Sequence, residues 1–222
     1  MSNRPVIVLV GNPNSGKTTL FNALTGAHQH VANYPGVTVE VKSAAVDLPG
    51  GGKVTLVDLP GTYSLTTYSP EERVARAAIF EQAPIAIICV LDASNLERNL
   101  YLLTQIAELG IPTVIALNMV DEAKRLGLEI DAERLERLTG MPVVRTVARK
   151  AVGAQEVLLA AMEAALRAAP PRPLTLSSHV EEALAEILPS VESIPGIEPK
   201  RVRFTALKLL EGDADVTAST AH

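Results

Sequence analysis

The hydrophobic residues of this chain fall into short aliphatic runs that alternate with longer stretches of helical periodicity. Each run has the length of a buried strand, and the longer stretches repeat their apolar residues at intervals of three and four. Strands are predicted at residues 6–10, 53–57, 85–91, 112–117 and 142–145, and helices at 19–25, 97–109, 131–138 and 154–168. This alternation predicts an α/β fold, with a mostly parallel, doubly wound sheet between two layers of helices.

Three other segments complete this part of the chain. Residues 37–48 partly alternate apolar and polar side chains, which predicts an edge strand followed by a turn at residues 49–52. Residues 27–36 are polar and rich in turn-forming types, so we expect a mobile loop there. Ser69-Pro70-Glu71-Glu72 is typical of a helix start, with Ser69 as the N-cap.

The composition changes at Ala169-Pro170-Pro171-Arg172-Pro173, which predicts a stiff linker. Two short helical patterns follow at residues 179–188 and 199–210, and the small, polar residues 212–222 are expected to fray. We therefore divide the chain into a first domain, residues 1–169, and a linker with a small helical extension, residues 170–222. The extension is too short for a full core, so it should pack on the first domain or continue in a longer parent.

Composition and charge narrow the class of protein. A length of 222 residues with 47% hydrophobic residues is enough for one sizeable core. The net charge of −5 disfavours a nucleic-acid partner, because neutralising phosphates requires clustered Lys and Arg. The single cysteine, Cys89, lies in an aliphatic run, which fits a buried thiol in a reducing compartment. No apolar run approaches the roughly 20 residues of a membrane span, and no signal peptide is recognised, so we expect a soluble, cytosolic chain.

The turn between the first predicted strand and helix has the pattern Gly-x-x-x-x-Gly-Lys-Thr. Glycines let successive backbone N–H groups surround phosphate oxygens, and the helix N-terminus adds the positive end of its dipole. The lysine can reach the β- and γ-phosphates, and the threonine hydroxyl can bind Mg²⁺. The pattern predicts a nucleotide-phosphate site made by Gly11, Asn12, Pro13, Asn14, Ser15, Gly16, Lys17, Thr18 and Thr19.

Two further motifs are predicted to contact Mg²⁺ and the γ-phosphate. After the strand at 53–57, an aspartate can hold the Mg²⁺ shell and a glycine N–H can meet the γ-phosphate. In the predicted loop, a threonine hydroxyl can close on Mg²⁺ when a γ-phosphate is present. The first motif is Asp58, Leu59, Pro60 and Gly61, and the second is Gly36, Val37 and Thr38. The predicted Mg²⁺ ligands are Thr18, Thr38 and Asp58.

The base is predicted from two motifs at later strand ends. Asn118-Met119-Val120-Asp121 fits the Asn-Lys-x-Asp guanine motif with methionine in place of lysine. The Asp121 carboxylate can accept hydrogen bonds from guanine N1–H and N2–H, which adenine cannot match, so we expect GTP and GDP as ligands and strong rejection of ATP. A Ser-Ala-Lys type loop that contacts the base is expected at Val147, Ala148 and Arg149. Valine lacks the serine hydroxyl, which predicts weakened base affinity.

Residues 11–26, 33–40, 58–65 and 118–121, with Leu207-Lys-Leu-Leu-Glu-Gly-Asp213, carry a family resemblance. Over about residues 5–213 the chain resembles the cytosolic G domain and helical domain of ferrous iron transport protein B (FeoB). The resemblance implies a Ras-like P-loop G domain that regulates Fe²⁺ uptake, with a GDI-like helical extension that is shorter here than in the family. It also implies a soluble N-terminal part of a longer protein, on the cytoplasmic face of the bacterial inner membrane, with the membrane permease domain as partner.

The hydrolytic mechanism is partly readable from the same residues. Thr62 follows Gly61 where Ras-like enzymes place a water-orienting glutamine, so slow intrinsic turnover is predicted. The resemblance implies K⁺ activation, because G domains with asparagine at the position of Asn14 often use K⁺ with that asparagine as a ligand. The alternative is an asparagine that braces its own loop. The residues assigned to catalysis are Lys17, Asn14 and Thr38.

A second function class has the same set of motifs. A free-standing GTPase of RNA modification or ribosome assembly would also contain them, but the acidic charge and the lack of an RNA-binding extension favour the transporter domain. The sequence leaves the oligomeric state open, so a homo-oligomer remains among the candidate assemblies.

Overall fold

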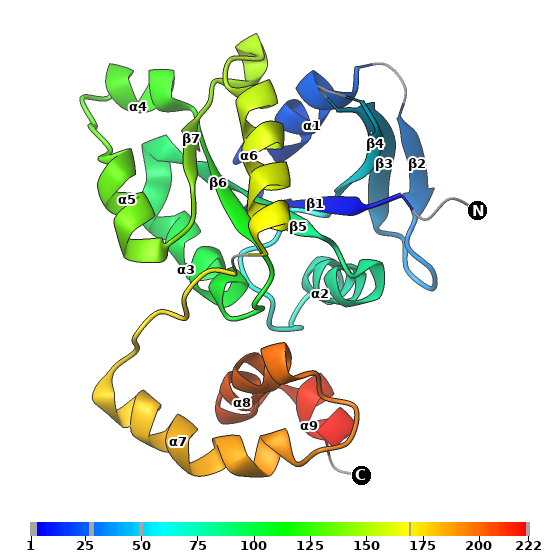
Figure 1. The fold of residues 1–222 in the computed structure, drawn as a ribbon, viewed down its shortest axis with the longest axis vertical. Coiled ribbons are helices and arrows are strands. Elements are labelled where there is room, and N and C mark those ends of the chain that lie inside the picture. The colour runs from blue at the N-terminus through cyan, green and yellow to red at the C-terminus, as the bar shows by residue number, and fades with distance from the viewer. Residues whose placement is uncertain (1–3, 27–28, 49–50, 169, 221–222) are drawn as a thin grey trace.

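One seven-stranded sheet organises the computed structural model, which describes all residues except 1–3, 27–28, 49–50, 169 and 221–222 (Figure 1). The strand order is β2-β3-β4-β1-β5-β6-β7. Strands β4, β1, β5, β6 and β7 run parallel, whereas β3 is antiparallel to both β2 and β4. The bounds are β1 Val6–Gly11, β2 His30–Asn33, β3 Glu40–Asp47, β4 Lys53–Asp58, β5 Ala86–Asp92, β6 Thr113–Asn118 and β7 Val143–Arg145. The predicted α/β class with a mostly parallel sheet is confirmed.

Helices cover both faces of the sheet (Figure 1). Because successive side chains of a strand point to opposite faces, β1 contributes to two cores. Ile7 and Leu9 share one with α1 (Lys17–Thr25) and α6 (Ala154–Arg167), while Val8 and Val10 share the other with α2 and α3. The remaining helices of the first domain are α2 Pro70–Gln82, α3 Leu96–Ala107, α4 Val120–Arg125 and α5 Ala132–Thr139, with 3₁₀ turns η1 Ala93–Asn95 and η2 Ala148–Lys150.

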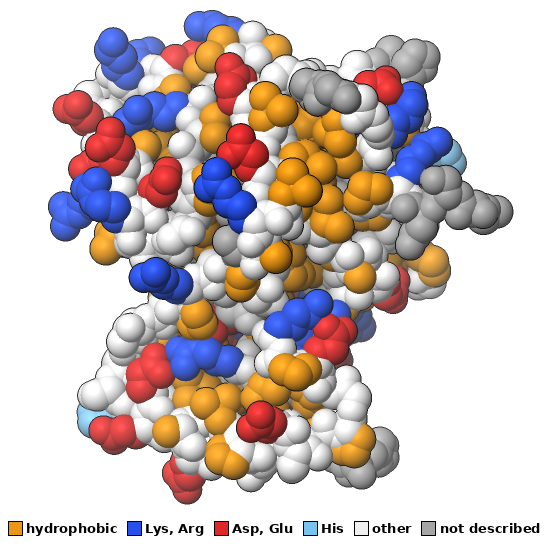
Figure 2. Space-filling model, in the orientation of Figure 1, with side chains coloured by type: hydrophobic (Ala, Val, Ile, Leu, Met, Phe, Trp, Pro, Cys, Tyr) orange, Lys and Arg blue, Asp and Glu red, His pale blue; other side chains and the backbone are white. Residues whose placement is uncertain are grey.

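The helical extension consists of α7 (Ser178–Glu192), η3 (Pro199–Arg201), α8 (Val202–Leu210) and α9 (Ala214–Thr220). It has a small apolar core of its own, made by Leu184, Val191 and Ala206. The extension also packs against α2 of the first domain, where the rings of Phe204 and Phe80 meet edge to face with centroids 5.8 Å apart. Figure 2 shows an indentation in the outline of the molecule where the two parts meet. Among the described helices, none is both long enough and apolar enough to span a membrane.

Helix α2 begins as the sequence predicts. The Glu72 amide donates to the Ser69 hydroxyl at 3.1 Å, and the Ser69 amide donates to the Glu72 carboxylate at 3.0 Å. This reciprocal pair satisfies two backbone donors that the first turn of a helix otherwise leaves free. It fixes the start of the helix whose Phe80 contacts the extension.

Three sequence predictions need correction. Residues 212–222 were expected to fray, but α9 forms there because the Asp213 carboxylate caps it, accepting the Val216 amide at 3.0 Å. Part of the loop expected at residues 27–36 is strand β2, whose exposed side chains carry no apolar pattern and which is held by pairing with β3. The edge strand predicted at residues 37–48 is β3, which begins at Glu40 and is not at the edge, because β2 pairs with its outer side. Helix α4 was not predicted. The predicted turn at residues 49–52 lies partly outside the described residues.

Candidate functional site

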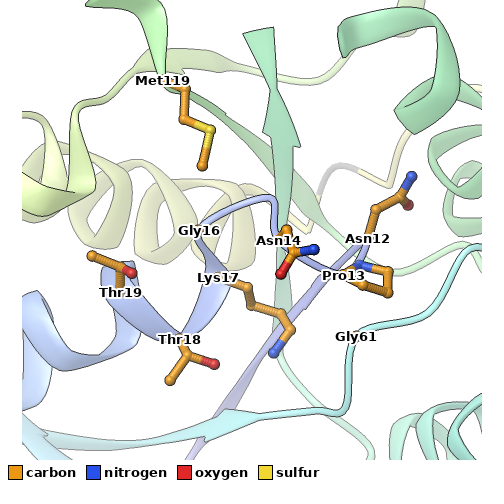
Figure 3. Close-up of a pocket in the computed structure, with 9 residues that line it drawn as sticks. All are labelled: Asn12, Pro13, Asn14, Gly16, Lys17, Thr18, Thr19, Gly61 and Met119. Atoms are coloured by element: carbon orange, nitrogen blue, oxygen red, sulfur yellow. The ribbon is translucent and has the colours of Figure 1, made fainter. Parts of the chain in front are cut away.

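The glycine-rich turn between β1 and α1 borders a cavity of about 470 Å³ (Figure 3). The turn folds back through two residues with left-handed backbone, Asn14 at φ 66° and Gly16 at φ 87°. The cavity brings together residues of the glycine-rich turn, the 58–61 motif and the 118–121 motif. Its lining is Asn12, Pro13, Asn14, Gly16, Lys17, Thr18, Thr19, Gly61 and Met119. Figure 3 shows Met119 at one end and Gly61 towards the other.

Asn118 joins three strand-end loops. Its side-chain amide donates to the Ser15 carbonyl at 2.9 Å, and its side-chain oxygen accepts the Ala148 amide at 2.9 Å and the Thr146 hydroxyl at 3.1 Å. A Cβ atom on Gly16 would lie 2.1 Å from the Asn118 amide nitrogen, which explains why that position is glycine. The predicted phosphate and base motifs are therefore held together by one buried side chain. Thr146, which the sequence analysis did not select, belongs to the same network.

Asp58 contacts both Lys17 and Thr18, two residues that line the cavity. The Lys17 ammonium forms an ion pair with one oxygen of Asp58, and the Thr18 hydroxyl donates to the other at 2.7 Å. Lys17 and Asp58 are both buried. A carboxylate beside a threonine hydroxyl is an all-oxygen donor set, which fits the preference of Mg²⁺. An anionic phosphate can replace Asp58 as the partner of the lysine.

A second cavity of about 250 Å³ adjoins the first, and Gly16, Thr19 and Met119 line both. Asp121, Val147, Ala148 and Arg149 line the second cavity as well. The Arg149 guanidinium hydrogen-bonds the Asp121 carboxylate at 2.7 Å and holds the pKa of Asp121 below its ordinary value. Asp121 is therefore ionised near neutral pH and able to accept hydrogen bonds.

The 58–61 motif passes directly over the glycine-rich turn. A Cβ atom on Gly61 would lie 3.0 Å from the Pro13 Cα atom, and the Thr62 amide donates to the Gly11 carbonyl at 3.2 Å. Leu59 is buried, and Pro60 is half-buried between it and Gly61. The Thr62 hydroxyl is engaged within its own turn, where it donates to the Ser64 carbonyl at 2.6 Å. The Thr62 hydroxyl therefore does not point towards an attacking water, which a glutamine orients at this position in Ras-like enzymes.

The predicted loop threonine is not brought to the site. Gly36, Val37 and Thr38 line neither cavity, and Thr38 is exposed. The neighbouring Tyr34 hydroxyl bonds the Glu81 carboxylate on α2, and burial together with this hydrogen bond raises the pKa of Tyr34 to about 12. The segment that contains Thr38 is therefore linked to α2 rather than to the phosphate cavity.

The segment after Gly61 has anchors that the sequence analysis missed. The Gln105 side-chain oxygen on α3 accepts the Leu65 amide at 2.6 Å. Lys208 on α8 is buried and donates to the Thr66 hydroxyl at 2.9 Å and to Glu211 at 2.7 Å. No local pattern marks these residues, because their partners lie far away in the sequence. Both the first domain and the extension therefore hold this segment.

Comparison with known proteins identifies the family. The family model described as "Ferrous iron transport protein B" matches residues 5–161. The Fe(2+) transporter FeoB of Escherichia coli (strain K12) is 44% identical over 216 residues, which are 93% of this chain and 27% of that protein. The chain spans about a quarter of the length of the curated relatives it matches.

Solved structures extend the match over both parts of the chain. A crystal structure of a mutant S. thermophilus NFeoB bound to GDP is 42% identical, with a TM-score of 0.90, and the match covers 98% of this chain and 84% of that chain. A mutant S. thermophilus NFeoB bound to GDP·AlF4⁻ is 43% identical, with a TM-score of 0.83, and the match covers 97% and 82%. On the family match and the shared fold, the chain belongs to the ferrous iron transport protein B (FeoB) family.

Proposed function

We propose that this chain binds GTP and hydrolyses it to GDP and phosphate. The observation that carries the proposal is the pair of adjoining cavities, with Lys17 and Asp58 in or beside one and Asp121 in the other. Their sizes and their shared lining suit a phosphate chain and a base bound as one ligand. The relatives whose structures contain GDP and GDP·AlF4⁻ support the same ligand class.

Guanine specificity is assigned to Asp121. Its carboxylate has two neighbouring cations, Arg149 at 2.7 Å and Lys150 at 3.4 Å, which keep it ionised beside the base cavity. Calorimetry with GTP, GDP and ATP tests this assignment. We expect no measurable ATP binding, and we expect Asp121→Asn to lose GDP affinity and gain affinity for xanthosine diphosphate. Equal affinities of the unmodified protein for GTP and ATP would contradict it.

Mg²⁺ is assigned to Thr18 and Asp58, joined by Thr38 when a γ-phosphate is bound. When bound, the ion would neutralise charge on the β- and γ-phosphates. Lys17 would then exchange its Asp58 partner for phosphate oxygen, which leaves the carboxylate free to face the metal shell. Thr38 must move to reach this site, so its role is confined to the triphosphate state.

We further propose slow intrinsic hydrolysis that K⁺ accelerates. Thr62 is turned into its own loop, and the Asn14 side chain lines the phosphate cavity without a hydrogen-bond partner among the described residues, which favours a ligand role over loop bracing. A cation held by Asn14 near the β–γ bridge would help most in the transition state. Turnover should rise at least about tenfold when KCl replaces NaCl, which corresponds to ~1.4 kcal/mol. Equal rates in the two salts, or a salt effect that survives in Asn14→Ala, would refute the K⁺ site.

We assign residues 1–169 to the G domain and residues 170–222 to a regulatory helical extension of a ferrous iron transporter. The contact between Lys208 and Thr66 supports a regulatory role for the extension, because it connects the extension to the segment that follows Gly61. The partner would be the membrane permease domain of the parent, with this part on the cytoplasmic side. Membership of the transporter family favours this function over a ribosome-assembly GTPase. Iron uptake by the full-length protein should fail with Lys17→Ala, and uptake at the unmodified rate would contradict the proposal.

A further inference from the structure

An arginine on α3 lies beside the turn that follows Gly61. The guanidinium carbon of Arg98 is 4.3 Å from the centre of the Tyr63 ring, which is the geometry of a cation–π contact. Among the described residues, the Arg98 side chain forms no ion pair or hydrogen bond. By contrast, Arg73 and Arg76 on α2 are paired with acidic residues of the extension. The stacking on Tyr63 is therefore the main contact of the Arg98 guanidinium.

The backbone of Arg98 is tied to the glycine-rich turn. Its carbonyl oxygen accepts a hydrogen bond from the side-chain amide of Asn12 at 3.0 Å, and Asn12 is buried. On the other side, Gly61 lies over Pro13, and Tyr63 follows within the same turn. The start of α3, the glycine-rich turn and residues 61–63 thus lie close together. In Figure 3, Asn12, Pro13 and Gly61 lie towards the end of the phosphate cavity away from Met119.

The stacking adds to a backbone anchor, because the Thr62 amide already donates to the Gly11 carbonyl at 3.2 Å. Residues further along are held from inside, since Gln105 binds the Leu65 amide and Lys208 binds Thr66. Tyr63 is 39% exposed, and its ring is held against the protein by the Arg98 guanidinium. Arg98 lines neither nucleotide cavity, so the structure separates it from an arginine that contacts phosphate directly.

We propose that Arg98 is a positioning residue for GTP hydrolysis. By stacking on Tyr63 it holds residues 61–63 against the glycine-rich turn, so that the Gly61 N–H faces the γ-phosphate. This inference rests on the proposed GTPase function. It applies to the hydrolytic step and leaves GDP binding alone, because GDP has no γ-phosphate for Gly61 to meet.

The test combines steady-state GTP hydrolysis with GDP calorimetry. Arg98→Ala and Tyr63→Leu should each lower kcat by about two- to fivefold, the factor that corresponds to an exposed cation–π contact. KM and GDP affinity should stay close to those of the unmodified protein. Arg98→Lys keeps the cation and Tyr63→Phe keeps the ring, so each should have a higher kcat than Arg98→Ala or Tyr63→Leu. The Arg98→Ala/Tyr63→Leu double variant should be no slower than either single variant.

The matched control variant alters another exposed tyrosine. Tyr68→Leu removes a tyrosine that is 85% exposed in the same segment and should leave kcat unchanged. Unchanged turnover in Arg98→Ala, or losses that multiply in the double variant, would overturn the positioning role. A loss in Arg98→Ala far larger than in Tyr63→Leu would also overturn it, because Arg98 would then act on the phosphate itself. Absence of hydrolysis by the unmodified protein would instead refute the proposed function.

Discussion

Replacing Asp213 by alanine should strongly destabilise the protein. The Asp213 carboxylate is fully buried and pairs with Arg76 at 2.6 Å, while the second partner of Arg76, Asp215, lies at 3.2 Å and is 45% exposed. Removing one member of a buried ion pair costs about 3–5 kcal/mol, because the remaining charge is left in a poorly solvated site. Arg76 keeps Asp215, which favours the lower end of that range. Loss of the cap on α9 adds about 1 kcal/mol, for a total of about 4 kcal/mol.

Asp215→Ala is the internal control, because it removes the other carboxylate from the same guanidinium. Its pair is partly exposed, so we expect a loss of only about 0.2–1 kcal/mol. The chain contains no tryptophan, so urea unfolding is best followed by circular dichroism. With a slope of about 2 kcal/mol per molar, Asp213→Ala should lower the urea midpoint by about 2 M. Hydrogen exchange at the α9 amides detects the same effect if the extension opens locally. Equal, small losses in both variants would refute the reasoning.

Three other predictions concern nucleotide binding and the extension. Gly16→Ala should abolish GDP binding in calorimetry, since a Cβ atom would displace the Asn118 amide, and retained affinity would contradict the close contact. Thr38→Ala should slow GTP hydrolysis and leave GDP affinity intact, because Thr38 lies outside both cavities; hydrolysis at the unmodified rate would show that another residue closes on Mg²⁺. The hydrogen bond from Arg203 lowers the pKa of Glu181 from 4.5 to about 2. The bond between Arg203 and Glu181 therefore stabilises the fold fully above pH 4.5, and this stabilisation is lost as the pH falls towards 2. Over that pH range, the melting temperature of Glu181→Gln should fall less than that of the unmodified protein.

The parts of the fold that the sequence predicted are those set by local chemistry. A buried strand followed by Gly-x-x-x-x-Gly-Lys-Thr requires a turn into a helix, and Ser69 with Glu72 encodes a helix start within four residues. The lining of both cavities by the predicted motifs follows from the meeting of parallel strand ends at one edge of the sheet.

The rest depends on partners that are distant in the sequence. Helix α9 forms because Asp213 is held by Arg76, a residue 137 positions earlier. Lys208 would be placed in solvent by any amphipathic rule, yet it is 1% exposed because Thr66 and Glu211 satisfy its ammonium group. Strand β2 has no apolar alternation to reveal it, since its side chains are all exposed. Long-range pairing of this kind leaves no periodic signal along the chain.

The network around Asn118 has a thermodynamic consequence. Its bonds to Ser15 and Ala148 fix the phosphate turn and the base loop before any nucleotide arrives, so a diphosphate enters a site whose conformational entropy has already been lost in folding. Under the role proposed for Thr38, the third phosphate meets the opposite situation, because this exposed residue would have to be ordered on binding. Part of the affinity for GTP would then be spent on that ordering, whereas GDP would incur no such cost. On the same proposal, the empty protein resembles the diphosphate complex more closely than the triphosphate complex, and release of the loop after hydrolysis would recover the ordering cost.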